Sequence, residues 1–246
     1  MANGRGWGQD ATLAPGWDRV GSAAWNALAA PETWAPAVGA VAFYGIGNAD
    51  QKVSDWASRS TPVFGSQDRA GRMSDDLAMA ADVIWIASAA ATPSGGEFDE
   101  WFLNKLKGLG VQTGTAVLLR GTVGGLKDAF DRTRPNGEPG SMPSGHASNA
   151  SLAATMASKN IETRGWSDAA VTATQIGLGT LTAAVSWARV EAQKHYPSDV
   201  LAGIALGHFF GAFFTDAFLG IADPNAILVL FEPSRDGIAA TVRFGF

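Results

Sequence analysis

The chain has 246 residues, enough for one domain with a sizeable core, and its 17% charged and 46% hydrophobic residues are typical of a folded protein rather than a disordered one. A net charge of −5 argues against non-specific binding to nucleic acid. The absence of cysteine excludes disulfides and thiolate metal sites.

Helical patterns recur through the first 220 residues, separated by a predicted loop at 62–71 and a Pro-Ser-Gly-Gly break at 93–96. The chain is therefore expected to be all-α, a bundle of helices. The expected helices cover residues 20–29, 34–44, 51–59, 73–91, 98–109, 111–132, 148–158, 168–193 and 197–219.

The pattern changes at the C-terminus, where apolar residues alternate with others over 238–246. With the apolar run at 226–232 and the turn at 233–237, this alternation predicts a short C-terminal β-hairpin packed on the helical core. A strand that ends in Phe246 is also typical of the last strand of an outer-membrane barrel. Such a barrel needs about eight strands, whereas the rest of this chain is predicted to be helical.

Several cations and a Pro-Ser-Gly-His turn lie within residues 127–146. Lys127 and Arg134 are seven residues apart, so on a helix they would share one face, and Pro135 would end that helix. The turn at 143–146 precedes a run of small residues and helix formers. It is therefore expected at a helix N-terminus, where free N–H groups favour an anion. The stretch predicts a cradle for a phosphate-like group.

A second stretch, residues 189–199, supplies the remaining groups. Arg189 carries a planar guanidinium suited to phosphate oxygens. His195 is a candidate nucleophile or base, and Asp199 is a candidate partner for its other ring nitrogen. A nucleophile oriented by a third group follows the general logic of a catalytic triad.

Three motifs carry a family resemblance: K-x6-R-P at 127–135, P-S-G-H at 143–146 and R-x5-H-x3-D at 189–199. Their order and spacing resemble the signature of the phosphatidic acid phosphatase type 2 superfamily, which includes bacterial class A acid phosphatases, lipid phosphatases and vanadium haloperoxidases. Ala188 stands where acid phosphatases usually carry Ser. The resemblance covers roughly residues 100–220.

The resemblance implies a helical bundle of the acid phosphatase and haloperoxidase type, and metal-independent hydrolysis of lipid phosphates or small phosphomonoesters through a phosphohistidine. It implies that His195 attacks phosphorus, that Asp199 fixes its tautomer, and that His146 protonates the leaving group and then activates water. No cofactor is implied, although vanadate could occupy the phosphate site. The residues expected to hold the phosphate oxygens are Lys127, Arg134, Ser144, Gly145 and Arg189.

Other functions stay open at this point. A vanadate-dependent haloperoxidase would use the same cradle, but such relatives are typically much longer. A non-catalytic lipid-binding member is the second alternative, although every motif residue with a chemical role is present. An integral lipid phosphatase is the third. The sequence gives no oligomeric state.

Two apolar stretches, 169–188 and 200–222, raise the question of a membrane. The second contains His208 and Asp216, and the mean hydropathy of the chain is only +0.05. We therefore expect buried core helices, with His208 a core histidine; the alternative is one or more membrane-embedded helices.

The first residues lack the apolar segment of a secretory signal, but the resemblance to exported relatives implies a periplasmic or exported protein, with association with a membrane surface left open. We expect one phosphatase domain over 1–246, with an irregular lead at 1–30, a catalytic helical core at 98–220 and the hairpin at 226–246.

Overall fold

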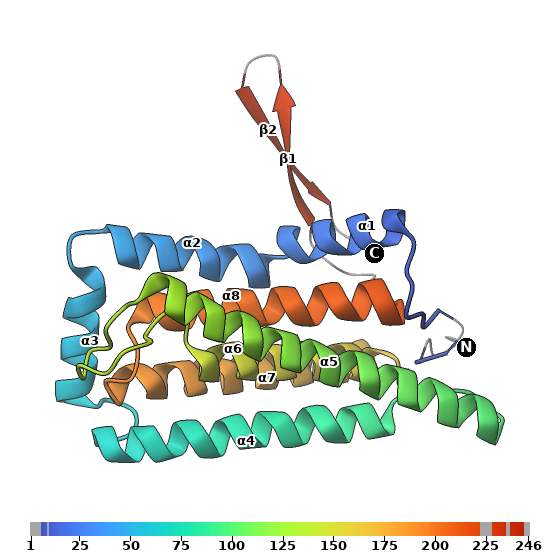
Figure 1. The fold of residues 1–246 in the computed structure, drawn as a ribbon, viewed down its shortest axis with the longest axis horizontal. Helices are drawn as coiled ribbons and strands as arrows, with labels where there is room; N and C mark the ends of the chain where they lie inside the picture. Colours follow the sequence, from blue (N-terminus) through green and yellow to red (C-terminus); the bar gives the residue numbers. More distant parts are fainter. Residues whose placement is uncertain (1–5, 9, 222–227, 235–236, 244–246) are drawn as a thin grey trace.

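The computed structural model describes residues 6–8, 10–221, 228–234 and 237–243. Over these residues the chain forms eight α-helices, a π-helical turn, η1 (Thr215–Leu219), that continues the last of them, and two strands (Figure 1). The helices are α1 (Trp17–Ala29), α2 (Pro31–Gly45), α3 (Ala49–Ser60), α4 (Gln67–Ala91), α5 (Phe98–Phe130), α6 (Gly145–Glu162), α7 (Asp168–Glu191) and α8 (Pro197–Phe214).

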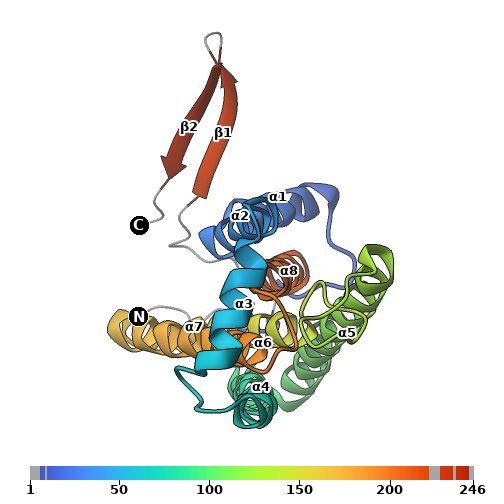
Figure 2. The same ribbon diagram turned by 90° about the vertical axis from the view of Figure 1, so that its left-hand side faces the viewer.

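The long helices run side by side, and α3 crosses one end of the bundle (Figures 1 and 2). Helix α8 lies in the middle, in contact with α1, α2, α5, α6 and α7. The α3 end of the bundle gathers the C-terminal ends of α5 and α7 and the N-terminal ends of α4, α6 and α8. The three sequence motifs lie in these helix ends and in the loops that join α5 to α6 and α7 to α8.

Close packing of α6 on α8 depends on small residues. Gly203, Gly207 and Gly211 recur every four residues on the face of α8 that meets α6. A Cβ atom on Gly203 would lie 2.6 Å from the backbone oxygen of Ser144, and one on Gly207 would lie 2.1 Å from that of Ser148. Such small residues at every fourth position let two helix backbones approach closely. The interface fixes the N-terminal end of α6 against that of α8.

The distribution of apolar side chains is the reverse of that in a typical soluble core. Among the described residues, 19 of the 31 buried apolar residues are alanine, whereas 26 large apolar residues are exposed. Single exposed apolar residues are ordinary, but contiguous apolar surface marks a contact with lipid or another protein. The exposed set on α4 and α5 includes Ile86, Phe98, Phe102 and Leu118.

Several boundaries differ from those expected. Helix α5 is continuous across residue 110, where we expected two helices to meet. Helix α4 starts at Gln67 because the Ser66 side chain caps it by accepting a hydrogen bond from the Arg69 amide. Because α5 ends at Phe130, Arg134 lies beyond the helix, and the prediction that it shares a helix face with Lys127 is wrong.

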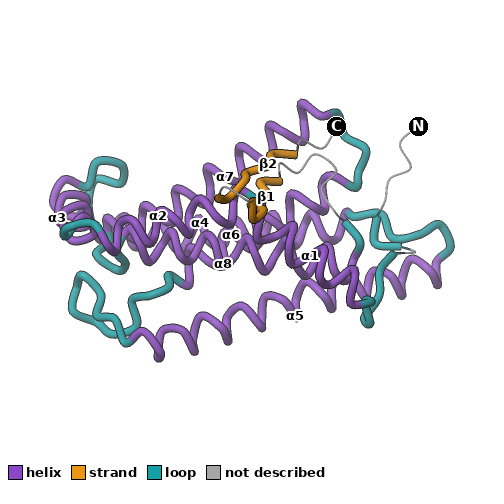
Figure 3. The backbone as a smooth tube through the Cα atoms, turned by 90° about the horizontal axis from the view of Figure 1, so that it is seen from above, coloured by secondary structure: helices purple, strands orange, loops and turns teal. Residues whose placement is uncertain are grey.

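The C-terminal strands β1 (Leu228–Ser234) and β2 (Gly237–Arg243) pair antiparallel, with Leu228 opposite Arg243. Other residues of the expected hairpin, namely 226–227, 235–236 and 244–246, lie outside the described ones. β1 contacts α1, and the two strands extend away from the helices (Figures 1 and 2). Figure 3 views the molecule from the side on which they project. The expectation of a hairpin packed on the helical core is therefore wrong in its placement.

Candidate active site

The candidate nucleophile His195 lies at the α3 end of the bundle, in the short connection between α7 and α8. Its side chain is only 2% exposed, and its Nδ1 lies 3.7 Å from Oδ2 of Asp199, in the first turn of α8. Within the described part of the chain, this Nδ1 has no hydrogen-bond partner. The structure therefore places His195 beside Asp199, with a small movement needed to close a hydrogen bond between them.

Burial decides the charge of His195. Its pKa is lowered to about 4, mainly by removal from water and further by the positive charges of Arg189 and Lys127, while the nearby Asp199 carboxylate offsets part of this effect. The imidazole is therefore neutral near pH 7 and keeps one ring nitrogen with a free lone pair. This is the protonation state that a nucleophilic histidine requires.

Asp199 is held by a network of donors. Its Oδ1 accepts a hydrogen bond of 2.7 Å from Arg132 Nη1, and its Oδ2 accepts from the Ser141 hydroxyl and, at 2.8 Å, from the Tyr196 amide. The carboxylate is fully buried, so these donors replace the water that it loses. The network fixes the direction in which Asp199 faces His195.

Arg132 links this network to α3. Its Nη2 donates to Asp50 at 2.8 Å, and Asp50 accepts from the Ser198 amide at 2.8 Å. The guanidinium lies 4.2 Å from the ring centroid of Tyr196 and 5.1 Å from that of Tyr44. Arg132 thus joins Asp199 on α8 to Asp50 on α3.

Arg189, at the end of α7, is buried like His195, and its side chain contacts residues of α4. Nη1 of Arg189 donates to the Ser74 hydroxyl at 3.0 Å and lies 3.6 Å from Oδ1 of Asp75. Among the described residues, its buried Nε has no hydrogen-bond partner. A buried guanidinium N–H without an acceptor suits an anion oxygen.

Two further cations, Lys127 and Arg134, meet at the loop that follows α5. The ammonium of Lys127 and the Nε of Arg134 both donate to the backbone oxygen of Gly140. Arg134 also pairs with Glu138 at 2.8 Å. Glu138 also lies 3.3 Å from Lys194, and its hydrogen bonds from Asn136 and Lys194 lower its pKa. One loop carbonyl thus accepts from both Lys127 and Arg134, and one exposed carboxylate pairs with both Arg134 and Lys194.

The Pro-Ser-Gly-His turn starts α6, as the sequence predicted. Ser144 is the N-cap: its side chain accepts a hydrogen bond from the Ala147 amide, and its own amide donates to the Asp199 backbone oxygen at 2.9 Å. Gly145 follows as the first helical residue. His146 comes next, and its Nε2 is 2.8 Å from Oδ1 of Asp75.

The sequence pointed to eight site residues, and the structure places all of them at one end of the bundle, with His195 beside Asp199 and His146 facing α4. It adds residues that the motifs do not contain. No group of three or more His, Asp or Glu side chains suited to a metal ion occurs among the described residues. The added residues are Asp50, Ser74, Asp75, Arg132 and Ser141.

Together, the helix arrangement and the site define a helical-bundle protein with two histidines and several cations at one end. Residues 108–220 match the PAP2 superfamily, as the three motifs indicated. The family match supports a phosphatase.

One solved structure supports the fold. The crystal structure of a transmembrane PAP2-type phosphatidylglycerolphosphate phosphatase from Bacillus subtilis aligns with 74% of this chain and 90% of that chain, with a TM-score of 0.55 and 18% sequence identity. At this identity the likeness shows the helical fold alone. The family match ends at residue 220, so it gives no support to the hairpin as part of the family fold. A search of curated proteins found no significant match.

Two helices in the described part are long and apolar enough to cross a membrane: Asp168–Glu191 and Pro197–Leu219. In their most apolar windows, 22% of residues are buried in the first and 50% in the second. Helix α7 is thus largely outside the core, and the expectation that both stretches form buried core helices is wrong for α7. Thr33 Oγ1 lies 2.7 Å from His208 Nδ1, so the expectation of a satisfied core histidine is confirmed.

Proposed function

We propose that this chain is a membrane-associated phosphatase that hydrolyses lipid phosphomonoesters through a phosphohistidine. The observation that carries the proposal is the buried, neutral His195 beside Asp199, with the cations Arg189 and Lys127 close enough to lower its pKa. A neutral imidazole next to a cluster of cations favours attack on an anionic phosphorus centre.

In the first step, the lone pair on Nε2 of His195 attacks phosphorus and the bond to the leaving alkoxide breaks. Asp199 accepts the hydrogen bond from Nδ1–H and stabilises the positive charge that develops on the ring. Arg189, Lys127 and Arg134 stabilise the non-bridging oxygens, as positioning and charge do most of the work in phosphoryl transfer. His146 gives its proton to the alkoxide, so that a neutral alcohol leaves.

In the second step, water attacks the phosphohistidine. His146, now neutral, takes a proton from this water, the P–N bond breaks, and inorganic phosphate forms while His195 regains its neutral ring. The starting state of both histidines is restored when phosphate leaves. The chain's own cations supply the charge stabilisation throughout.

The outer surface supports a lipid setting. Helix α7 has no charged side chain between Asp168 and Arg189, and most of its apolar window is outside the core. Alanine-rich interfaces with large apolar side chains outside are typical of helices that pack within a bilayer. The candidate site lies at one end of these helices, where a lipid headgroup would be.

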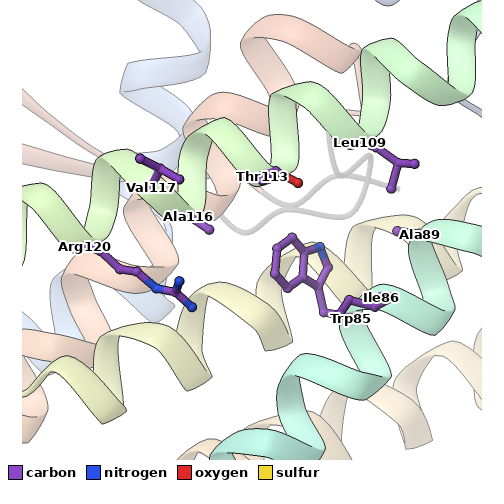
Figure 4. A pocket seen from close by; sticks show the side chains of 8 residues that line it. All are labelled: Trp85, Ile86, Ala89, Leu109, Thr113, Ala116, Val117 and Arg120. Atoms are coloured by element: carbon purple, nitrogen blue, oxygen red, sulfur yellow. The ribbon is translucent and has the colours of Figure 1, made fainter.

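A groove between α4 and α5 offers a place for an acyl chain. It has a volume of about 260 Å³ and is lined by apolar side chains, with Arg120 at one end and Leu109 at the other (Figure 4). Arg120 is seven residues before Lys127, two turns or about 10 Å along the same face of α5. The groove therefore begins about two helical turns from Lys127 and runs along the bundle between α4 and α5. The other lining residues are Trp85, Ile86, Ala89, Thr113, Ala116 and Val117.

The test is a substrate series in which only the acyl chain changes. Lipid phosphates of increasing chain length, held below their micelle concentrations in a fixed detergent, are expected to gain kcat/KM because each buried methylene contributes ~0.8 kcal/mol, about fourfold. His195→Ala is expected to abolish turnover in a folded protein. A flat series would contradict the lipid substrate, whereas substantial turnover by His195→Ala would contradict the nucleophile.

The groove has its own control. Thr113→Trp places a large ring among the lining residues and is expected to remove the gain with chain length while preserving turnover of a short-chain ester. Leu118→Trp, on an exposed position of the same helix outside the groove, makes a comparable change in bulk. If both variants lose the chain-length dependence equally, the groove is not the acyl-chain site.

A further inference from the structure

Asp75, on the first half of α4, makes contacts with two parts of the site at once. One oxygen, Oδ1, lies 2.8 Å from Nε2 of His146 and 3.6 Å from Nη1 of Arg189. The adjacent Ser74 hydroxyl is 3.5 Å from the same oxygen and accepts from Arg189 Nη1 at 3.0 Å. A carboxylate oxygen thus lies between a candidate proton donor and a candidate phosphate-binding cation.

This position conflicts with substrate binding. Under the proposed function, Arg189 binds a non-bridging oxygen and His146 gives a proton to the leaving oxygen. These two oxygens are bonded to the same phosphorus, so they must occupy the space between Nη1 of Arg189 and Nε2 of His146. Asp75 carries a negative charge into that space, and a second anion cannot share it without strong repulsion.

The Asp75 side chain is also free to leave. Its side chain is 64% exposed and that of His146 is 37% exposed, so water can replace the contact at small cost. By contrast, Asp199 is fully buried and held by several donors. The two carboxylates near the histidines therefore have different roles: one is fixed, and the other can swing outward.

We propose that Asp75 is an internal competitor, an anionic latch that occupies the cradle between His146 and Arg189 in the empty enzyme and is displaced by the phosphate of the substrate. The inference rests on the proposed function, because it takes the roles of His146 and Arg189 from it. While Asp75 occupies the cradle, its negative charge offsets the positive charge there. The observed affinity for any phosphate-like anion is therefore reduced in proportion to the fraction of molecules in which the cradle is open.

Removal of the carboxylate tests the latch directly. In Asp75→Asn, orthovanadate and inorganic phosphate are expected to bind about twofold to fivefold more tightly, the range of an exposed ion pair, and KM is expected to fall while kcat stays near that of the parent protein. Asp76→Asn removes the same charge from the neighbouring exposed position of α4 and is expected to leave affinity nearly unchanged. Calorimetric titration with orthovanadate measures affinity whether or not turnover is seen.

Three results would overturn the latch. The first is equal affinity for orthovanadate in Asp75→Asn and the parent. The second is a fall in kcat at constant KM, which would show that Asp75 supports His146 during the reaction. The third is a structure with bound vanadate in which His146 Nε2 and Asp75 Oδ1 remain 2.8 Å apart; the latch requires them to separate beyond hydrogen-bond distance. A parent enzyme without phosphatase activity would instead refute the proposed function.

Discussion

Replacement of Arg132 by Met tests whether the buried network behind Asp199 supports the site. The substitution keeps most of the apolar stem but removes the donors that reach Asp199 at 2.7 Å and Asp50 at 2.8 Å. Both carboxylates are buried, at 0% and 6% exposure, so each would keep a negative charge without this cation. Breaking a buried ion pair by removing one partner costs about 3–5 kcal/mol.

We expect Arg132→Met to lower the free energy of unfolding by about this amount and to reduce kcat by about 100-fold, since misplacing a reacting group by about 1 Å costs that much. Arg132→Lys should recover only part of the stability. It keeps the positive charge, but one ammonium cannot bridge both carboxylates as a planar guanidinium does. Denaturant unfolding in detergent measures stability, and initial rates at saturating substrate measure kcat.

Arg69→Met is the matched control, because Arg69 is exposed on α4, and it should change neither quantity. The double variant Asp50→Asn/Arg132→Met should be less destabilised than the sum of the single variants, since removing one carboxylate relieves the uncompensated charge. Near-parental stability and kcat in Arg132→Met would refute the role of this network.

The remaining predictions concern titration, packing and the membrane. Burial lowers the pKa of His195 to about 4, so between about pH 4 and 6.5 the unfolded chain binds more protons than the folded protein. The free energy of unfolding should therefore fall as the pH drops through that window. An NMR titration of labelled histidine that gives a pKa near 6.5 for His195 would contradict this prediction. Gly207→Ala should prevent folding because its Cβ would meet the Ser148 oxygen at 2.1 Å, whereas Gly177→Ala, in open space on α7, should fold normally. The protein should stay in the membrane fraction after an alkaline wash; its release into the soluble fraction would contradict membrane embedding.

The motif residues could be predicted from the sequence because their chemistry is local. His195 and Asp199 are four residues apart at the start of a helix, and Ser144 has the spacing of an N-cap. The positions of Arg132 and Asp75 could not be predicted in this way. Arg132 meets Asp199 across 67 residues of chain, and Asp75 meets His146 across 71, so both contacts depend on how whole helices pack.

The sequence pattern also could not predict which apolar helix surfaces are buried in the bundle and which are exposed. The stretch 169–188 is apolar on all sides, and such a stretch suits both a protein core and a bilayer. Average hydropathy favoured a core because polar residues elsewhere lower the mean. Only the packing of α4 and α6 against α7 shows that its apolar window is 22% buried.

Packing between α6 and α8 connects these observations to the chemistry. Gly203 lies against the backbone oxygen of Ser144, and the Ser144 amide donates to the backbone oxygen of Asp199 at 2.9 Å. A larger residue at Gly203 would therefore separate the N-terminal ends of the two helices, one carrying His146 and the other carrying Asp199. Under the proposed mechanism Asp199 orients His195, so the distance between the proposed nucleophile and proton donor depends on a helix interface with no room for a single methyl group. The proposed reaction therefore requires small residues in this interface as well as the two histidines.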